Sequence, residues 1–334
     1  MNNEKTIQYI TYLFAINKID LTFIDESVSS NITTLKFMIE GLKGINKLNL
    51  VVKTLESALD LKINSSLDFN ILTLKLYNAS EKVYLFENYI LHGERNKDEI
   101  FLGIGQNGCP IFESVDNLKS LLIGGSSGFG KSNLLHQIIL SYLLLNDNNY
   151  LMLIDPKYTE FSWYKKTGLK NRLLLDVAST FEESEKALYG FSNLIDERFK
   201  RMKAKNLRFS DEPSVLLVID EYASLFTNSY EKKVINNLIS RIASLGRAAR
   251  CYLIIATQHP TNSNLTNGIR VNLQSKLALH CESRNQSFNI LDSNEAIKLK
   301  EKGDFILKVD GSKEAIEGRA SLVTDNLLSK CLKA

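Results

Sequence analysis

The sequence has few cysteines, and none of them is spaced for a metal site or a disulfide framework. Its four cysteines, Cys109, Cys251, Cys281 and Cys331, lie far apart, with no Cys-x-x-Cys pair and no histidine-rich cluster nearby. This distribution argues against a zinc site and against a disulfide scaffold. It is typical of a protein that works in a reducing cytosol.

A membrane span and a secretory signal are also missing. No stretch approaches the roughly 20 apolar residues that a membrane helix requires. The run Tyr9 to Ile16 is too short, and Lys18 and Asp20 follow it directly. The amino terminus, MNNEKTIQ, has no basic region leading into an apolar one. We therefore expect a cytoplasmic protein that reaches a membrane only by docking on a membrane protein.

Charge of one sign is scarce as well, since the formal net charge is only +3. This argues against a protein that coats nucleic acid through bulk charge, although a local basic patch is compatible with it. The apolar fraction of 44% and the charged fraction of 24% are those of a globular protein. A chain of 334 residues is long enough for two domains.

The patterns divide the chain into residues 1–100 and residues 101–334. In the first part we expect a small α+β subdomain, with a strand over Thr33–Gly41, a helix over Asn46–Ile63 and a strand over Asp68–Asn78. Residues 79–100 carry mixed charge and are expected to form a helix and a linker.

From residue 101 onward, short apolar runs alternate with helical segments. The runs are LKSLLIGG, YLMLIDP, VLLVIDE and CYLIIATQ. Continuous apolar runs of this length, separated by helices, predict strands that are buried on both faces of a mainly parallel sheet. The fold class is therefore α/β.

The strongest motif is a phosphate-binding loop, GSSGFGKS, which fits the pattern GxxxxGK[ST]. It follows an apolar strand and precedes a helix, as the mechanism requires. Glycines let the loop curl so that its backbone N–H groups point at phosphate oxygens, and the helix directs its positive end at the same anion. The nucleotide-binding residues predicted here are Gly125, Ser126, Ser127, Gly128, Phe129, Gly130, Lys131, Ser132 and Asn133. Lys131 is expected to reach the β- and γ-phosphates of ATP, and Ser132 to ligate Mg²⁺.

Two further strands end in polar residues that suit hydrolysis. VLLVIDEYASL ends its strand in Asp220 and Glu221. We expect Asp220 to hold Mg²⁺ and Glu221 to orient or deprotonate the attacking water. CYLIIATQHP ends in Thr257 and Gln258, and ligands of parallel sheets bind at such strand ends. Gln258 is a candidate sensor of the γ-phosphate, and a loop-capping glutamine is the alternative.

With these motifs in order, the chain resembles the FtsK/SpoIIIE family of DNA translocases and their relatives among conjugative coupling proteins. The resemblance covers roughly residues 30–310. It is carried by LLIGGSSGFGKSNLLHQII, LMLIDPKYTEFSWY, IDERFKRMKAKNLRF, VIDEYASL, RIASLGRAARCYLIIATQHP and KEKGDFIL, and by an α/β segment ahead of the motor.

The resemblance implies a RecA-like motor that assembles as a ring, usually a homo-hexamer, around double-stranded DNA. It implies ATP held between subunits with Mg²⁺. Asp155 and Lys157 match the family's Asp-Pro-Lys motif, where a polar role beside the nucleotide and a plain turn stiffened by Pro156 are both open.

The chain departs from the family pattern in two respects. We expect neither a membrane anchor nor a carboxy-terminal winged-helix domain, which puts sequence-directed movement in doubt. Phe288 stands where the family has an arginine that acts on the neighbouring subunit. The substitutes for this arginine finger are Arg284, Arg270, Arg247 and Arg250, and the sequence does not rank them.

A basic stretch lies before the Asp220 strand and is a candidate DNA contact. Its residues are Arg198, Lys200, Arg201, Lys203, Lys205 and Arg208, with no acid until Asp211. Clustered cations follow a phosphate backbone without reading bases, which suits a motor that passes any sequence. A solvated helix face and a subunit contact are the alternatives.

Taken together, the sequence predicts an ATPase that translocates double-stranded DNA, in plasmid or mobile-element transfer or in chromosome segregation. A protein-secretion ATPase of the same superfamily is the first alternative. A nucleotide-gated assembly protein with slow hydrolysis is the second, and the intact Lys131, Asp220 and Glu221 argue against it. A metabolic kinase is disfavoured because no lid for an acceptor substrate is evident.

Overall fold

The computed structural model describes residues 3–324 apart from 29–31, 42–44, 60, 78–83, 91–98, 167, 262, 263 and 266. The chain divides into two compact units, Met1–Val83 with Gln106–Cys109, and Tyr84–Gly105 with Pro110–Ala334. This division falls earlier than the boundary that we placed after residue 100. Strand β5 (Glu99–Gly105) pairs with β13 (Ile316–Arg319), and the Phe86 N–H donates to the Leu322 carbonyl, so both segments belong to the larger unit.

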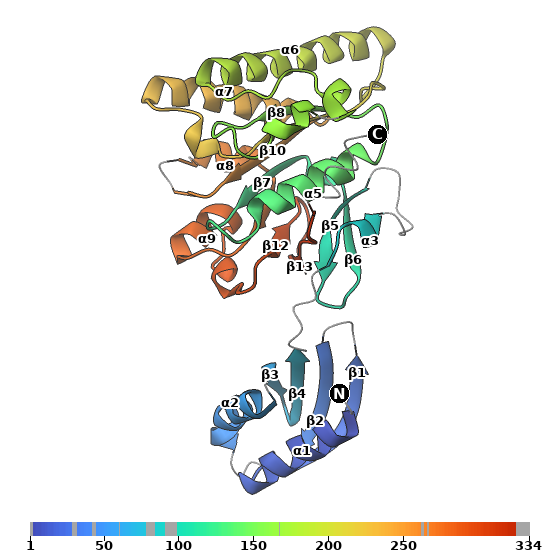
Figure 1. Cartoon of the computed structure of the whole chain (residues 1–334), viewed down its shortest axis with the longest axis vertical. Coiled ribbons are helices and arrows are strands. Elements are labelled where there is room, and N and C mark those ends of the chain that lie inside the picture. Colours follow the sequence, from blue (N-terminus) through green and yellow to red (C-terminus); the bar gives the residue numbers. More distant parts are fainter. Residues whose placement is uncertain are drawn as a thin grey trace. The chain divides into compact units, whose positions relative to one another are not determined.

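The smaller unit is an antiparallel sheet of four strands in the order β1-β2-β4-β3, with two α-helices (Figure 1). Its elements are α1 (Asn3–Ile16), β1 (Leu21–Val28), β2 (Ile32–Ile39), the 3-10 helix η1 (Ile45–Lys47), α2 (Leu48–Leu59), β3 (Lys62–Asp68) and β4 (Ile71–Tyr77). Alternate residues of β2 and β4 are buried against α1 and α2, which gives this unit its own hydrophobic core.

The prediction for the smaller unit was incomplete. The predicted strand, helix and strand correspond to β2, α2 and β4, but the helix ends at Leu59 and Ile63 lies in β3 instead. Helix α1 and strand β1 were not predicted. Of the helix and linker expected over residues 79–100, residues 79–83 and 91–98 lie outside the described residues, and the short helix α3 (Glu87–Ile90) lies between them.

The larger unit is built on a sheet of nine strands in the order β6-β5-β13-β12-β11-β7-β10-β9-β8. The remaining strands are β6 (Pro110–Ser114), β7 (Ser120–Gly124), β8 (Tyr150–Ile154), β9 (Val215–Ile219), β10 (Cys251–Thr257), β11 (Ser275–Ala278) and β12 (Asp304–Lys308). Its other α-helices are α4 (Val115–Leu118), α5 (Lys131–Leu143), α6 (Phe181–Lys205), α7 (Ser229–Leu245), α8 (Asn267–Asn272) and α9 (Arg284–Leu291). The 3-10 helices are η2 (Ser162–Lys166), η3 (Gly168–Arg172), η4 (Tyr222–Ser224) and η5 (Glu295–Lys298).

One half of this sheet is parallel and carries every predicted motif strand. Strand β10 pairs in parallel with both β7 and β9, β8 pairs with β9, and β11 pairs with β7. The other half, from β11 through β12, β13 and β5 to β6, is antiparallel. The predicted α/β fold with a mainly parallel RecA-like sheet is confirmed for the half that holds the motifs. The antiparallel half was not anticipated.

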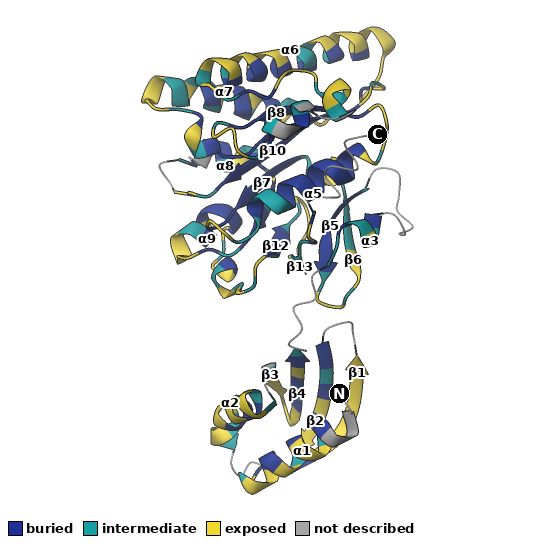
Figure 2. Cartoon of the chain, viewed as in Figure 1, coloured by how far each residue is buried: buried dark blue, intermediate teal, exposed yellow. Residues whose placement is uncertain are grey.

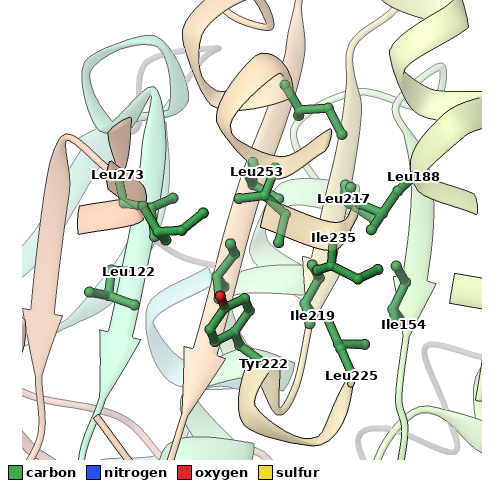
Figure 3. Packing of buried hydrophobic residues seen from close by; sticks show 14 of the residues in the cluster. Leu122, Ile154, Leu188, Leu217, Ile219, Tyr222, Leu225, Ile235, Leu253 and Leu273 are labelled. Atoms are coloured by element: carbon green, nitrogen blue, oxygen red, sulfur yellow. The ribbon is translucent and has the colours of Figure 1, made fainter. Parts of the chain in front are cut away.

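Helices cover both faces of the parallel half, so β7, β9 and β10 are buried along their whole length (Figure 2). Successive residues of a strand point to opposite faces. Leu217 and Ile219 of β9 and Leu253 of β10 therefore pack with Leu188 of α6 and Ile235 of α7 (Figure 3). The alternate residues pack against α5 on the other face. This explains why each motif strand reads as an unbroken apolar run.

Candidate nucleotide site

The phosphate-binding loop joins the end of β7 to the start of α5. Gly130 precedes the helix with a φ of 95°, a left-handed conformation that a side chain disfavours. A Cβ at Gly125 would lie 2.7 Å from the Leu279 Cβ, so glycine is also needed for the loop to pass β11 closely. Ser127 and Gly128 at the tip are exposed. The exposed tip of the loop is thus followed directly by α5, whose positive end lies next to it.

The structure brings the loop together with the predicted acids of β9. The Lys131 ammonium donates to the Asp220 carboxylate Oδ1 at 2.5 Å and to the Asp220 backbone oxygen at 2.8 Å. Both side chains are buried, with 4% and 3% of their surface exposed. Strand β10 separates β7 from β9, and its carboxyl end therefore lies between the loop and Asp220.

Glu221 is held in place from that central strand. Its Oε1 accepts a hydrogen bond from the Thr257 hydroxyl at 2.8 Å, and its Oε2 accepts one from the Gln258 backbone N–H at 3.1 Å. The Lys157 ammonium lies 3.6 Å from the same Oε2. The carboxylate is 1% exposed, so these contacts set its orientation. Sequence reasoning missed the bond from Thr257.

Asp155 ends β8 directly beside the end of β9 and is completely buried. Its Oδ2 accepts the backbone N–H groups of Glu160 and Phe161 at 2.8 and 2.9 Å, which folds the Asp-Pro-Lys segment back over the site. Glu160 thereby reaches α5, where its Oε2 lies 3.7 Å from the Nε2 of His136. Neither Glu160 nor His136 was predicted. The sequence signal that could have found Glu160 is its position five residues after Asp155, the acid that follows strand β8.

The residues present fit a divalent cation. Ser132 and Asp220 supply oxygen donors, which Mg²⁺ prefers. Burial raises the pKa of the Asp220 carboxyl; Lys131 opposes this rise, while the charges of Glu160 and Asp155 add to it. Several carboxylates thus surround one ammonium, and a cation relieves their repulsion. Among the described residues no three His, Cys, Asp or Glu side chains form a metal cage, so phosphate and water would provide the other ligands.

Some predicted nucleotide contacts instead hold the loop against the protein. The Asn133 side-chain amide donates to the Ser321 carbonyl, and its Oδ1 accepts the Val323 N–H, so Asn133 faces the carboxy-terminal segment and not the loop. Tertiary contacts therefore occupy both polar atoms of the Asn133 side chain, and its contact with nucleotide stays a prediction. Ser126 is bonded to the segment after β11, and the Phe129 ring stacks on His280 with centroids 4.1 Å apart.

The predicted DNA-binding stretch is only partly accessible. Arg198 is 4% exposed and donates to the carbonyls of Ala249 and Pro213 at 2.8 and 2.7 Å, so its assignment to DNA is wrong: its guanidinium ties α6 to the sheet. Arg201 forms a two-pronged pair with Glu212, and Lys205 pairs with Asp211. Lys200 and Lys203 are exposed and form no ion pair with the residues that the structure describes.

The arginine-finger candidates differ in whether their side chains already form an ion pair within the chain. Arg270 forms an ion pair with Asp292 and lies over the Phe288 ring, so it is committed within its own chain. Arg284 begins α9 and Arg247 follows α7; both are exposed. Neither one pairs with an acid in the described part of the chain.

The loop between β7 and α5 can hold phosphate, and an aspartate and a glutamate follow β9, with β10 between the two strands. This arrangement defines a P-loop ATPase of RecA-like fold. The sequence pattern of the FtsK/SpoIIIE family matches residues 92–211 and 179–262. The chain belongs to the FtsK/SpoIIIE family.

Curated relatives include the DNA translocase FtsK of Staphylococcus aureus (strain Mu50), 32% identical over 247 residues, a match that covers 67% of this chain and 31% of that protein. FtsK of Helicobacter pylori (strain J99) is 29% identical over 273 residues, covering 76% and 32%. The chain thus spans about a third of the length of these relatives.

Solved structures share the fold. The pCW3 conjugation coupling protein TcpA, determined with ATPγS, superposes with a TM-score of 0.67 at 19% identity and covers 96% of both chains. The cytoplasmic domain of the type VII secretion ATPase EccC of Thermomonospora curvata gives a TM-score of 0.59 at 19% identity, covering 70% of this chain and 30% of that one. Within the described residues, no helix has the length and apolar character to cross a membrane.

Proposed function

We propose that this chain hydrolyses ATP and couples hydrolysis to movement along double-stranded DNA. The observation that supports it most is the bonding of Lys131 to Asp220 with Glu221 held beside them, in a chain about 30% identical to DNA translocases. We propose two processes in which this movement would serve: plasmid or mobile-element transfer, and chromosome segregation. The motor would act in the cytoplasm, with a membrane protein as its docking partner.

The chemistry follows from the contacts of the site. Backbone N–H groups of residues 125–130 and the start of α5 bind the phosphates. Lys131 would exchange Asp220 for the β- and γ-phosphate oxygens, and Ser132 and Asp220 would hold Mg²⁺ through oxygen. The metal would supply neutralisation of the phosphate charge. Glu221 is held by the Thr257 hydroxyl and the Gln258 N–H, and in this position it orients the attacking water and accepts its proton.

Gln258 links hydrolysis to the rest of the motor in this proposal. Its backbone N–H holds Glu221 and its side chain is partly exposed at the end of β10, where a γ-phosphate would lie. Gln258→Ala should keep ATP binding and lose coupling between hydrolysis and DNA movement. A variant that binds, hydrolyses and moves DNA as the wild type does would remove this role.

A ring of subunits, a homo-hexamer in the family's usual form, supplies two features that one chain lacks. The first is a cation that acts on a neighbour's phosphoryl group; Arg284 and Arg247 suit this role better than Arg270, because their guanidinium groups are exposed. The second is a channel in which a few lysines per subunit bind a DNA backbone. Mass measurement with and without nucleotide tests assembly.

Lys200 and Lys203 are the proposed DNA contacts. Reversing both charges should weaken duplex binding and flatten its dependence on salt, since each lost phosphate contact removes about 0.9 from the slope of log affinity against log salt. Lys186→Glu is the matched control, because Lys186 is exposed on the same helix α6 but lies near its other end. An equal effect of the control would mean that the stretch has no special role.

The steady-state rate of ATP hydrolysis with and without linear duplex DNA tests the whole proposal. We expect duplex DNA to raise the rate, Lys131→Ala to abolish it, and the wild type to displace a third strand from a triplex as it moves. The alternative is a protein-secretion ATPase, which would hydrolyse ATP at the same rate with and without DNA. A nucleotide-gated assembly protein would show almost no turnover.

A further inference from the structure

One face of helix α5, which follows the phosphate-binding loop, carries three polar side chains. Asn133, Gln137 and Ser141 are spaced by four residues and therefore share this face. Gln137 and Ser141 are completely buried, and a buried polar group is costly unless it is hydrogen-bonded. The groups that bond to these side chains therefore show what this face of α5 holds.

The partner of Asn133 and Gln137 is the segment Ser321–Val323, which we call the clasp. The Gln137 Oε1 accepts the Ser321 backbone N–H at 2.7 Å and the Ser321 hydroxyl at 2.8 Å. The Asn133 Nδ2 donates to the Ser321 carbonyl at 2.7 Å, and the Asn133 Oδ1 accepts the Val323 N–H at 2.9 Å. The clasp lies beyond the end of β13, so these side chains supply the partners that neighbouring strands would give within a sheet.

The opposite edge of the clasp bonds to the first residues of the larger unit. The Leu322 N–H donates to the Tyr84 carbonyl at 2.6 Å, and the Phe86 N–H donates to the Leu322 carbonyl at 3.0 Å. The Val323 side chain is buried in the same hydrophobic cluster as Phe86. Tyr84 follows directly on Met1–Val83 of the smaller unit. The clasp thus connects the first turn of α5 to the point where the chain enters the larger unit.

Nucleotide and clasp hold the same turn of α5. Lys131 and Ser132, which would contact phosphate and Mg²⁺ in the proposed site, directly precede Asn133. A triphosphate that fixes this turn keeps Asn133 where its amide meets the clasp, and the docked clasp keeps the turn ready for the triphosphate. Two groups that order one element each reduce the ordering cost for the other, so their binding is coupled in both directions.

We propose that docking of the clasp is coupled to nucleotide binding, and that the clasp carries the nucleotide state to residues 84–86. The inference rests on the proposed ATP site and adds to it a connection with the segment that follows the smaller unit. Coupling between two binding sites typically changes affinity by a factor of about 5–150.

Hydrogen exchange of the wild-type full chain tests the coupling without any substitution. The Leu322 and Phe86 amides are followed with and without saturating MgATPγS, and we expect the nucleotide to slow their exchange about tenfold. The Val215 amide, bonded to the Arg250 carbonyl at the amino end of β9, is the reference for stabilisation of the whole unit and should change less. Equal exchange at Leu322 and Phe86 in the two states would overturn the proposal.

Two variants cut the clasp from α5 and leave the phosphate loop unchanged. Val323→Pro removes the N–H that donates to Asn133, and Gln137→Ala removes the acceptor of both Ser321 bonds. Each should weaken binding of a fluorescent ATP analogue about five- to tenfold. Leu322→Ala is the matched control, because Leu322 bonds through its backbone and its side chain is exposed, so this variant should bind as the wild type does.

The outcomes separate the coupling from the nucleotide site itself. Wild-type affinity in both cut variants, with circular dichroism showing an intact fold, would overturn the coupling, and so would an equal loss in the control. If both cut variants fail to fold, the exchange measurement on the wild type decides. A wild type that binds no nucleotide would overturn the proposed function instead, so the two failures are distinguishable.

Discussion

Replacing Arg198 by alanine should destabilise the larger unit, although Arg198 belongs to a stretch that reads as a DNA contact. The guanidinium donates to the carbonyls of Ala249 and Pro213 and lies 3.8 Å from the Glu212 carboxylate. A hydrogen bond from a charged donor contributes about 1.5–3 kcal/mol, and breaking a buried pair costs about 3–5 kcal/mol. The Arg198 Nε has no hydrogen-bond partner in the described protein, which favours the lower end. We expect a loss of about 3 kcal/mol.

Arg201→Ala is the matched comparison, because Arg201 is also an arginine of helix α6. Its side chain is 45% exposed, so solvent screens its pairs with Glu212 and Glu197 and they contribute little to stability. Thermal unfolding followed by circular dichroism should show a fall in the midpoint of about 6–12 °C for Arg198→Ala and of a few degrees for Arg201→Ala. Equal small shifts would refute the structural role of Arg198. Loss of DNA affinity in a fully folded Arg198→Ala would refute it as well.

Three further predictions concern other parts of the larger unit. Glu221→Gln should bind ATP normally and lower the hydrolysis rate by about 10²–10⁴, seen in a phosphate-release assay; a rate near wild type would mean another base. Gly246→Ala should destabilise the fold, since a Cβ there would lie 2.1 Å from the Cys251 carbonyl oxygen; an unchanged urea midpoint would contradict this. Burial raises the pKa of Cys251 to about 11 and of Cys281 to about 12. At pH 8, peptide mapping should therefore find exposed Cys109 alkylated before both, and the reverse order would be inconsistent with the fold.

The strands of the nucleotide site were predictable because a strand that is buried on both faces is a continuous apolar run in the sequence. β8, β9 and β10 are continuous apolar runs, and each ends at a residue of the site. In the smaller unit, β1 and β3 carry acids and serines on exposed positions, so their alternation is weak. The first two residues of β3, Lys62 and Ile63, were read as the end of a helix for that reason. Strand order and the antiparallel half depend on contacts between distant segments, which periodicity does not encode.

Within the site, the sequence identified the groups that the phosphate loop and strand ends position, and missed those that depend on a folded loop. Lys131, Asp220 and Glu221 meet because β7 and β9 end at the same edge of the sheet. Glu160 reaches His136 of α5 only because Asp155 bends the chain back, and no spacing in the sequence reveals this contact. Asn133 was predicted from its place in the motif, but that place did not reveal that its side chain hydrogen-bonds the carboxy-terminal segment.

Equilibrium binding of ATP to the wild type and to Lys131→Ala is the most direct test of the nucleotide site on which this account depends. Lys131 is the buried cation that faces both the loop and Asp220. Losing a charge-assisted bond to phosphate costs about 1.5–3 kcal/mol, so the variant should bind MgATP at least about tenfold more weakly. Equal binding by the two proteins, with both folded, would show that the triphosphate does not lie in this cradle.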